Sequence, residues 1–236
     1  MRKYKAILFD LDGTLLPMNM ERFVSAYMTS LCTYLAPHGF EPKALSENMW
    51  QSIAKMRKND GSQTNEEAFW NEFTAIYGEK AESGKKALEE YYEKEFPKVE
   101  AACDGKHNAK ELISLCKDKG FKVILATNPL FPRVATKNRI EWAGLCEDDF
   151  EFYTTYENSH FCKPYPEYYL EVMDRASLSP EECLMVGNDM RDDMSAAATG
   201  CDVYLITDYL ENRENGDYSN IKHGSFAEFF EFVKSL

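Results

Sequence analysis

Two acidic residues, Asp10 and Asp12, follow a short apolar segment near the start of the chain, in the stretch FDLDGT. Successive residues of an extended chain point to opposite sides, so both carboxylates are expected on one side of the backbone, with Leu11 directed away. Like charges at this spacing repel and raise each other's pKa. A hard divalent cation such as Mg²⁺, which takes oxygen ligands, would remove the repulsion. The tetrapeptide DLDG, taken alone, is also typical of a turn.

Polar residues follow two later apolar segments as well. Residues 121–127 end on Thr127, and Asn128 comes next; both side chains can donate hydrogen bonds to phosphate oxygens. Residues 183–187 precede the stretch NDMRDD, which offers Asn188, Asp189, Asp192 and Asp193. Taken alone, this stretch also fits a helix that begins with acidic residues. Beside the first carboxylate pair, it predicts the remainder of a metal site.

Lys163 is the one cationic residue of an otherwise uncharged stretch, FCKPY. Pro164 favours an extended conformation at the lysine that precedes it. A lysine placed near a carboxylate and a phosphate would hold both through its charge. The ordinary alternative is a lysine exposed on the surface.

Five short apolar segments predict the strands that position these residues. Several of them lack the alternation of a half-exposed strand, as is typical of parallel strands covered on both faces. They comprise residues 4–9, 121–127, 150–155, 183–187 and 203–207. Helices that begin at proline or end at glycine are predicted at 107–120, 132–145, 166–176 and 191–200. This order predicts an α/β fold of βαβ units around one parallel sheet, with ligands beyond the carboxyl ends of its strands.

Residues 18–98 contain no credible strand, and their apolar residues recur at helical spacing, as at Phe23, Tyr27 and Leu31. A segment of this length is far longer than an ordinary strand-to-helix connection. We therefore predict a helical subdomain at 18–98, inserted into a core formed by 1–17 and 99–236. The aromatic residues of its three or four helices are expected to form the subdomain's own core.

Charge and cysteine content narrow the possible partners. The formal net charge is −13, from 27 basic and 40 acidic residues. An acidic surface argues against binding to nucleic acid or to an anionic membrane, and no run of about 18 apolar residues predicts a membrane span. The seven cysteines are scattered without a CxxC pair, which is typical of reduced thiols and favours a cytoplasmic protein. We expect a monomer or a weak homodimer.

These residues, in this order, resemble the haloacid dehalogenase superfamily and, within it, the phosphatase-type members. FDLDGTLL matches the first motif of the superfamily, including Thr14; Thr127 matches the second motif and Lys163 the third. The stretch VGNDMRDD is similar to the acidic fourth motif. The resemblance covers nearly all of the chain outside 18–98. It implies a Rossmann-like, doubly wound parallel sheet, with the inserted helices acting as a cap.

The resemblance implies a Mg²⁺-dependent phosphohydrolase that acts on a small phosphorylated molecule through an aspartyl-phosphate. Asp10 would be the nucleophile, and Asp12 the general acid and then the general base. The metal would be held by Asp10, Asp12 and the fourth motif. Where the family usually has an aspartate directly after glycine, this chain has Asn188 and then Asp189; we favour Asp189 as the ligand. Asp193 matches the second acidic residue of the fourth motif.

The remaining expectations concern the substrate. The residues expected to bind its phosphate are Gly13, Thr14, Thr127, Asn128 and Lys163. The cap residues that are candidates for contacting the rest of the substrate are Met18, Asn19, Arg22 and Lys55. A sugar phosphomutase of the same superfamily would keep the same catalytic residues. A receiver-like signalling module is a remote alternative, because receiver domains also carry acidic residues, threonine and lysine at strand ends but are about half this length.

Overall fold

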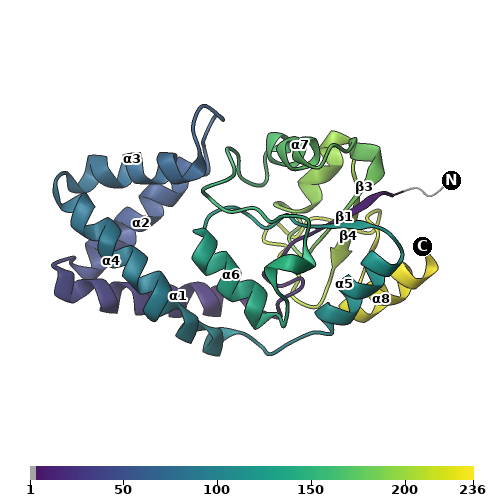
Figure 1. The fold of residues 1–236 in the computed structure, drawn as a ribbon, viewed down its shortest axis with the longest axis horizontal. Helices are drawn as coiled ribbons and strands as arrows, with labels where there is room; N and C mark the ends of the chain where they lie inside the picture. Colours follow the sequence, from purple (N-terminus) through teal and green to yellow (C-terminus); the bar gives the residue numbers. More distant parts are fainter. Residues whose placement is uncertain (1–3) are drawn as a thin grey trace.

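The computed structural model describes residues 4–236, which form a five-stranded sheet with helices on both faces (Figure 1). The strands are β1 (Ala6–Phe9), β2 (Lys122–Leu125), β3 (Cys183–Gly187), β4 (Asp202–Ile206) and β5 (His223–Gly224). Their order in the sheet is β2-β1-β3-β4-β5, and every neighbouring pair is parallel. The sheet extends from β1 in both directions, which confirms the predicted doubly wound α/β fold.

One predicted strand is wrong and one strand was missed. Residues 150–155 run beside β2, where the amide of Thr154 donates to the carbonyl of Leu125 at 3.1 Å. Only a single bridge, between Leu125 and Tyr153, forms along this segment, so it is an extended loop rather than a strand. The missed strand β5 contains two residues and no apolar run that could have indicated it.

The core helices explain why the strands lack alternation. These helices are α5 (Ala109–Asp118), α6 (Arg133–Trp142), α7 (Pro166–Arg175) and α8 (Phe226–Ser235). Ile7 and Phe9 of β1 belong to a hydrophobic cluster that includes residues of α5, α6 and α8, whereas Ala6 and Leu8 belong to a second cluster that includes residues of α7. Figure 1 shows α7 on the opposite side of the sheet from α5 and α8. Both faces of β1 are therefore apolar.

Three of the four predicted core helices are confirmed. After α5 and α6 the chain turns at Gly120 and Gly144, each with φ of +76°, a left-handed conformation that glycine adopts readily. The fourth predicted helix, 191–200, is a shorter 3₁₀ helix at Met194–Thr199. Its expected first turn is replaced by a loop, because the Asp189 carboxylate accepts hydrogen bonds from the amides of Arg191 and Asp192.

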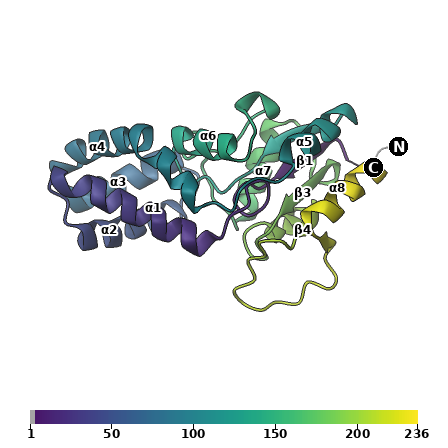
Figure 2. The ribbon, with the colours of Figure 1, turned by 90° about the horizontal axis from the view of Figure 1, so that it is seen from below.

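The inserted segment forms four α-helices that lie together at one end of the molecule, beyond the sheet (Figures 1 and 2). They are α1 (Met20–Leu35), α2 (Pro42–Met56), α3 (Asn65–Tyr77) and α4 (Lys80–Lys94), followed by a 3₁₀ helix at Phe96–Ala102. Their core is continuous with that of the sheet: Phe96 stacks on Trp142 of α6 with ring centroids 5.2 Å apart. The boundaries 18–98 for a cap subdomain remain a prediction.

Among the helices formed by residues 4–236, none combines the length and the apolar character that a bilayer crossing requires.

Candidate active site

The register of the three central strands brings the predicted site residues together. Phe9 of β1 lies opposite Leu125 of β2 and Val186 of β3, so the three strands end at the same level. The amide of Asp10 continues the ladder by donating to the Val186 carbonyl at 2.8 Å. The residues that follow each strand, Asp10 among them, therefore share one edge of the sheet.

Lys163 lies buried between two carboxylates. Its Nζ is 2.8 Å from Asp10 Oδ1 and 2.6 Å from Asp193 Oδ1, and its side chain is 1% exposed. Burial lowers the pKa of Lys163, but the charges of Asp10 and Asp193 raise it, and the resulting pKa lies well above the ordinary value. Burial and the neighbouring Asp10 raise the pKa of Asp193 to about 7. The lysine is thus a fixed cation that orients Asp10.

Asp12 is held by a second buried cation, Arg139 of α6. Its Oδ2 forms an ion pair with Arg139, whose side chain is 1% exposed and lies 4.4 Å from the ring centroid of Phe131. Asp12 Oδ1 has no hydrogen-bond partner among residues 4–236. Burial raises the pKa of Asp12, and Arg139 opposes that rise. One oxygen is therefore fixed by the guanidinium, whereas the other has no hydrogen-bond partner among the described residues.

The turn after Asp12 packs against Asn188 and is closed by its own hydrogen bonds. Gly13 has φ of +84°, and a Cβ there would lie 2.3 Å from Asn188 Nδ2, so only glycine fits. Thr14 is buried, and its Oγ1 donates to Asn188 Oδ1 at 3.0 Å. The amides of Gly13 and Thr14 donate to the carbonyls of Leu16 and Leu11. This placement does not support the prediction that Gly13 and Thr14 bind phosphate, because their donors are used within the turn.

The side chains of Asn188 and Asp189 both form hydrogen bonds, but with different partners. Asn188 donates from Nδ2 to the Tyr209 carbonyl at 2.6 Å, which sets the orientation of its amide and leaves Oδ1 facing Thr14. The Asp189 carboxylate accepts from two amides of its own loop, and its Oδ2 lies 3.6 Å from the Arg213 guanidinium. Asp193 Oδ2 accepts from the Asp189 amide at 2.9 Å and so fixes this loop against Lys163.

Residues 4–236 contain no group of three or more His, Cys, Asp or Glu side chains arranged to hold a metal ion. Mg²⁺ in phosphoryl-transfer sites is usually bound by one or two carboxylates, and waters and the substrate phosphate complete its octahedron. Asp10 and Asp189, with the backbone oxygen of Asp12, are a donor set of this kind. The side chains present therefore fit a hard cation without a dedicated protein cage.

Two polar side chains follow β2, the hydroxyl of Thr127 and the amide of Asn128. The Thr127 carbonyl accepts from Thr154 Oγ1 at 2.6 Å and from the Tyr168 hydroxyl at 2.8 Å, which fixes the backbone at the strand end. Asn128 Nδ2 donates to Asp192 Oδ2 at 3.0 Å, and its Oδ1 accepts from the Lys163 amide at 3.3 Å. Thr127 and Asn128 are thus held beside Lys163.

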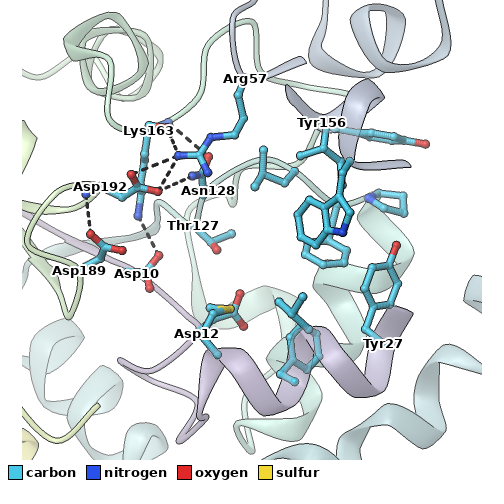
Figure 3. Close-up of a pocket in the computed structure, with 18 of the residues that line it drawn as sticks. Asp10, Asp12, Tyr27, Arg57, Thr127, Asn128, Tyr156, Lys163, Asp189 and Asp192 are labelled. Atoms are coloured by element: carbon cyan, nitrogen blue, oxygen red, sulfur yellow. Dashed lines mark hydrogen bonds and ion pairs between the residues drawn. The ribbon is translucent and has the colours of Figure 1, made fainter. Parts of the chain in front are cut away.

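A cavity of about 280 Å³ opens above these residues, between the sheet edge and the cap helices (Figure 3). The predicted site residues that line it are Asp10, Asp12, Thr127, Asn128, Lys163, Asn188, Asp189 and Asp193. Figure 3 shows Asp10, Lys163 and Asp189 gathered at one end, with Tyr27 and Tyr156 at the other. Gly13 and Thr14 are not among the lining residues.

The four cap residues expected to contact substrate do not line the cavity either. Asn19 caps α1 by accepting from the Arg22 amide at 2.9 Å, and Arg22 forms an ion pair with Asp104 of the returning chain. Met18 is buried and Lys55 lies on α2 away from the lining. Their contact with substrate remains a prediction, which this placement does not support.

Two cationic residues at the site were missed. Arg139 lies on the buried face of α6 with Ala135 and Trp142, and this charge at an apolar helical position was the available signal. Arg57, which follows α2, reaches from the cap to Asp192, with Nη2 3.2 Å from Oδ2, and its side chain is 34% exposed. Nothing in the sequence around Arg57 indicated that contact.

Comparisons with known proteins agree with this geometry. Residues 4–200 match the haloacid dehalogenase-like hydrolase family. Pyrophosphatase PpaX of Bacillus cereus (strain ATCC 10987) is 24% identical over 211 residues, which are 89% of this chain and 87% of that protein. The crystal structure of a HAD phosphatase from Thermococcus onnurineus superposes with a TM-score of 0.59 at 20% identity, over 97% of each chain.

A 2-haloacid dehalogenase from Pseudomonas syringae pv. tomato DC3000 superposes with a TM-score of 0.64 at 19% identity, over 98% of each chain. At these identities the two solved structures are similar in fold alone. The family match spans most of the chain. It includes β1, β2 and β3 with the residues that follow them, but not β4 and β5. The chain belongs to the haloacid dehalogenase-like hydrolase family.

Proposed function

We propose that this hydrolase is a Mg²⁺-dependent phosphatase that acts on a small phosphorylated molecule through an aspartyl-phosphate on Asp10. The observation that carries the proposal is the arrangement of two carboxylates at the end of β1, each held by its own buried cation. Asp10 is 2.8 Å from Lys163 Nζ, and Asp12 is paired with Arg139. One carboxylate is thereby positioned to attack, and the other to hold a proton.

In the first step an oxygen of Asp10 attacks phosphorus, and the bond from phosphorus to the leaving oxygen breaks. Asp12, protonated on its unpaired Oδ1, gives that proton to the leaving oxygen. In the second step Asp12, now a carboxylate, takes a proton from a water that attacks the phosphorus. The acyl phosphate bond breaks, and Asp10 and inorganic phosphate are released. Lys163 keeps Asp10 oriented throughout and offers its charge to the phosphate.

Mg²⁺, held by Asp10, the backbone of Asp12 and Asp189, would neutralise charge on the transferring phosphoryl group. We favour Asp189 over Asn188 because a carboxylate offsets more of the cation's charge than an amide oxygen does. Replacing each residue by alanine and measuring Mg²⁺ affinity by calorimetry tests this choice. A larger loss of affinity for Asn188→Ala than for Asp189→Ala would reverse the assignment.

The second carboxylate supports phosphate-ester hydrolysis rather than dehalogenation. A halide leaving group needs no proton, whereas an alkoxide does, and the resemblance of the first motif assigns Asp12 to that proton transfer. The name of the Bacillus relative, pyrophosphatase, describes hydrolysis of a phosphoanhydride, so it supports phosphoryl transfer to water rather than dehalogenation.

The first experiment measures hydrolysis of a generic aryl phosphate with Mg²⁺ and with a chelator. We expect Asp10→Asn to lose at least about a thousandfold in kcat, as for other covalent nucleophiles. The control is Asp118→Asn, an exposed aspartate at the end of α5, which should keep full turnover. Two in-line displacements also predict retention of configuration at a chiral phosphorus. Inversion would show direct attack by water and would refute the aspartyl-phosphate.

We also propose that the protein works as a monomer or weak homodimer in the cytoplasm. All seven cysteines lie within residues 4–236 and are unpaired, and most are buried, which suits a reducing compartment. Sedimentation at micromolar concentration tests the oligomeric state.

A further inference from the structure

The two ends of the cavity differ in polarity. The end at the sheet edge carries the carboxylates and Lys163, whereas the other end extends into the cap (Figure 3). Among the residues that wall the cap end are Phe23, Ile53, Trp70, Tyr92, Phe131 and Tyr156. They come from all four cap helices and from two core loops. The sequence analysis expected the aromatic residues of the inserted helices to form the cap's own core. Part of the set instead faces this cavity.

Few unpaired polar groups lie near the cap end; one is the buried indole N–H of Trp70, which has no hydrogen-bond partner among residues 4–236. The hydroxyls of Tyr27 and Tyr92 are 2.7 Å apart and hydrogen-bond to each other. The cationic residues that line the cavity, within the part of the chain described, are Arg57, Lys163 and Arg213. Each of them is paired with a carboxylate of the polar end, as in the 3.2 Å contact between Arg213 and Glu211. No cation of this set faces the apolar wall.

The two ends favour different parts of one ligand. A hydroxylated or anionic leaving group would give up its hydration at the cap end, where it would find few hydrogen-bond partners and no counter-charge from the lining cations. An apolar group would instead be favoured there, and burying one the size of a phenyl ring strengthens binding roughly 10- to 100-fold. Aromatic rings also match the ring edges and faces of the wall. The phosphate belongs at the polar end, beside Lys163.

Building on the proposed phosphatase function, we infer that the substrate is a phosphate monoester of an apolar alcohol, preferably an aromatic one, whose alcohol portion fills the cap end of the cavity. This class differs from pyrophosphate, whose leaving group is itself a hydrated anion. It also differs from sugar phosphates, whose hydroxyls would lie against the apolar wall unpaired. Trp50, which is 46% exposed and lines the same cavity, lies where the ring would enter from solvent.

The test compares esters of primary alcohols, because their leaving groups have similar intrinsic reactivity, and it adds pyrophosphate, an anhydride, as a separate comparison. We expect kcat/KM for 2-phenylethyl phosphate to exceed that for glucose 6-phosphate, glycerol phosphate and pyrophosphate by more than tenfold. A preference below tenfold, or a preference for any of the polar substrates, would overturn the inference while leaving the phosphatase function intact.

A matched pair of cap variants locates the preference. Ile53 lines the cavity, whereas Ile76 of α3 is equally half-buried but does not line it. Ile53→Asn should reduce the ratio of kcat/KM for 2-phenylethyl phosphate over glucose 6-phosphate at least fivefold. Ile76→Asn should leave that ratio within twofold of the unmodified protein. An unchanged ratio in Ile53→Asn would refute the assignment of the cap end as the alcohol site.

A binding measurement tests the inference even if no ester is hydrolysed. Two of the three tryptophans, Trp50 and Trp70, line the cavity, so their fluorescence should change when it is filled. We expect 2-phenylethylphosphonate to bind at least tenfold more tightly than methylphosphonate. Equal dissociation constants would overturn the inference. Tight binding of the phenylethyl compound without turnover of any ester would support the cap end as a site for apolar groups. It would refute the proposed function and, with it, the assignment of the ester as a substrate.

Discussion

Replacing Lys163 by methionine tests the charge balance on which the site depends. The ammonium is 1% exposed and contacts Asp10 at 2.8 Å and Asp193 at 2.6 Å. At an effective dielectric constant of about 20, each contact contributes roughly 6 kcal/mol of attraction, or about 12 kcal/mol together. Dehydrating the three ions costs several kcal/mol per ion and offsets more than half of that attraction. Methionine keeps most of the side chain's volume but leaves two buried carboxylates facing each other.

We expect Lys163→Met to lower the free energy of unfolding by about 3–5 kcal/mol at pH 8, the loss typical of breaking a buried ion pair. For a chain of this length that corresponds to a melting temperature lower by roughly 6–20 °C. The loss should shrink as the pH is lowered to 5. Without the lysine, the folded-state pKa of a buried carboxyl rises further above its unfolded value, so its contribution is retained at low pH and lost as the pH rises.

Urea unfolding with a chelator present, at pH 5 and at pH 8, measures both effects. The matched control is Lys110→Met, because Lys110 Nζ is also 2.6 Å from a carboxylate, that of Asp149, but its side chain is 54% exposed. Asp149 is buried, but the Lys110 ammonium remains hydrated, so its loss should cost about 1 kcal/mol or less. If Lys163→Met cost no more than Lys110→Met at pH 8, or if its cost did not change with pH, the reasoning would be refuted.

Two further predictions concern single charges. Loss of the cation in Arg139→Met should raise the pKa of Asp12 and move the basic limb of the pH profile of kcat/KM upward by about 1–3 units, since a close opposite charge lowers a carboxyl pKa by that amount. The control is Arg133→Met, on the exposed side of the same helix, which should leave the basic limb unchanged. Hydrogen bonds from Tyr153 and Arg133 lower the pKa of Glu147 to about 2, so its stabilising contribution is complete above pH ~4.5 and is lost as the pH falls toward 2. Glu147→Gln should therefore lose less of its urea midpoint between pH 5 and pH 3 than the unmodified protein, and equal losses would contradict the assignment.

The sequence by itself determined the catalytic edge of the sheet. Continuous apolar runs predict buried parallel strands, and the carboxyl ends of parallel strands meet at one edge. That rule alone is enough to bring Asp10, Thr127 and Asn188 together, although they are up to 178 positions apart in the chain. The helical insertion was readable for a similar reason, because apolar spacing of three and four residues is a local property.

Only the tertiary structure decided which ion-pair and packing partners each site residue contacts. Arg139 pairs with Asp12 because α6 directs its buried face at the β1 turn, and Arg57 meets Asp192 because α2 ends above the acidic loop. The same holds for Gly13, where the absence of a side chain allows the close approach of Asn188. Contacts of this kind depend on the packing angles between helices and sheet, which no local pattern encodes. Strand ends follow from sequence periodicity. The buried counter-ions Lys163 and Arg139 follow from packing within the core, and the apolar wall of the cavity follows from how the cap packs on that core.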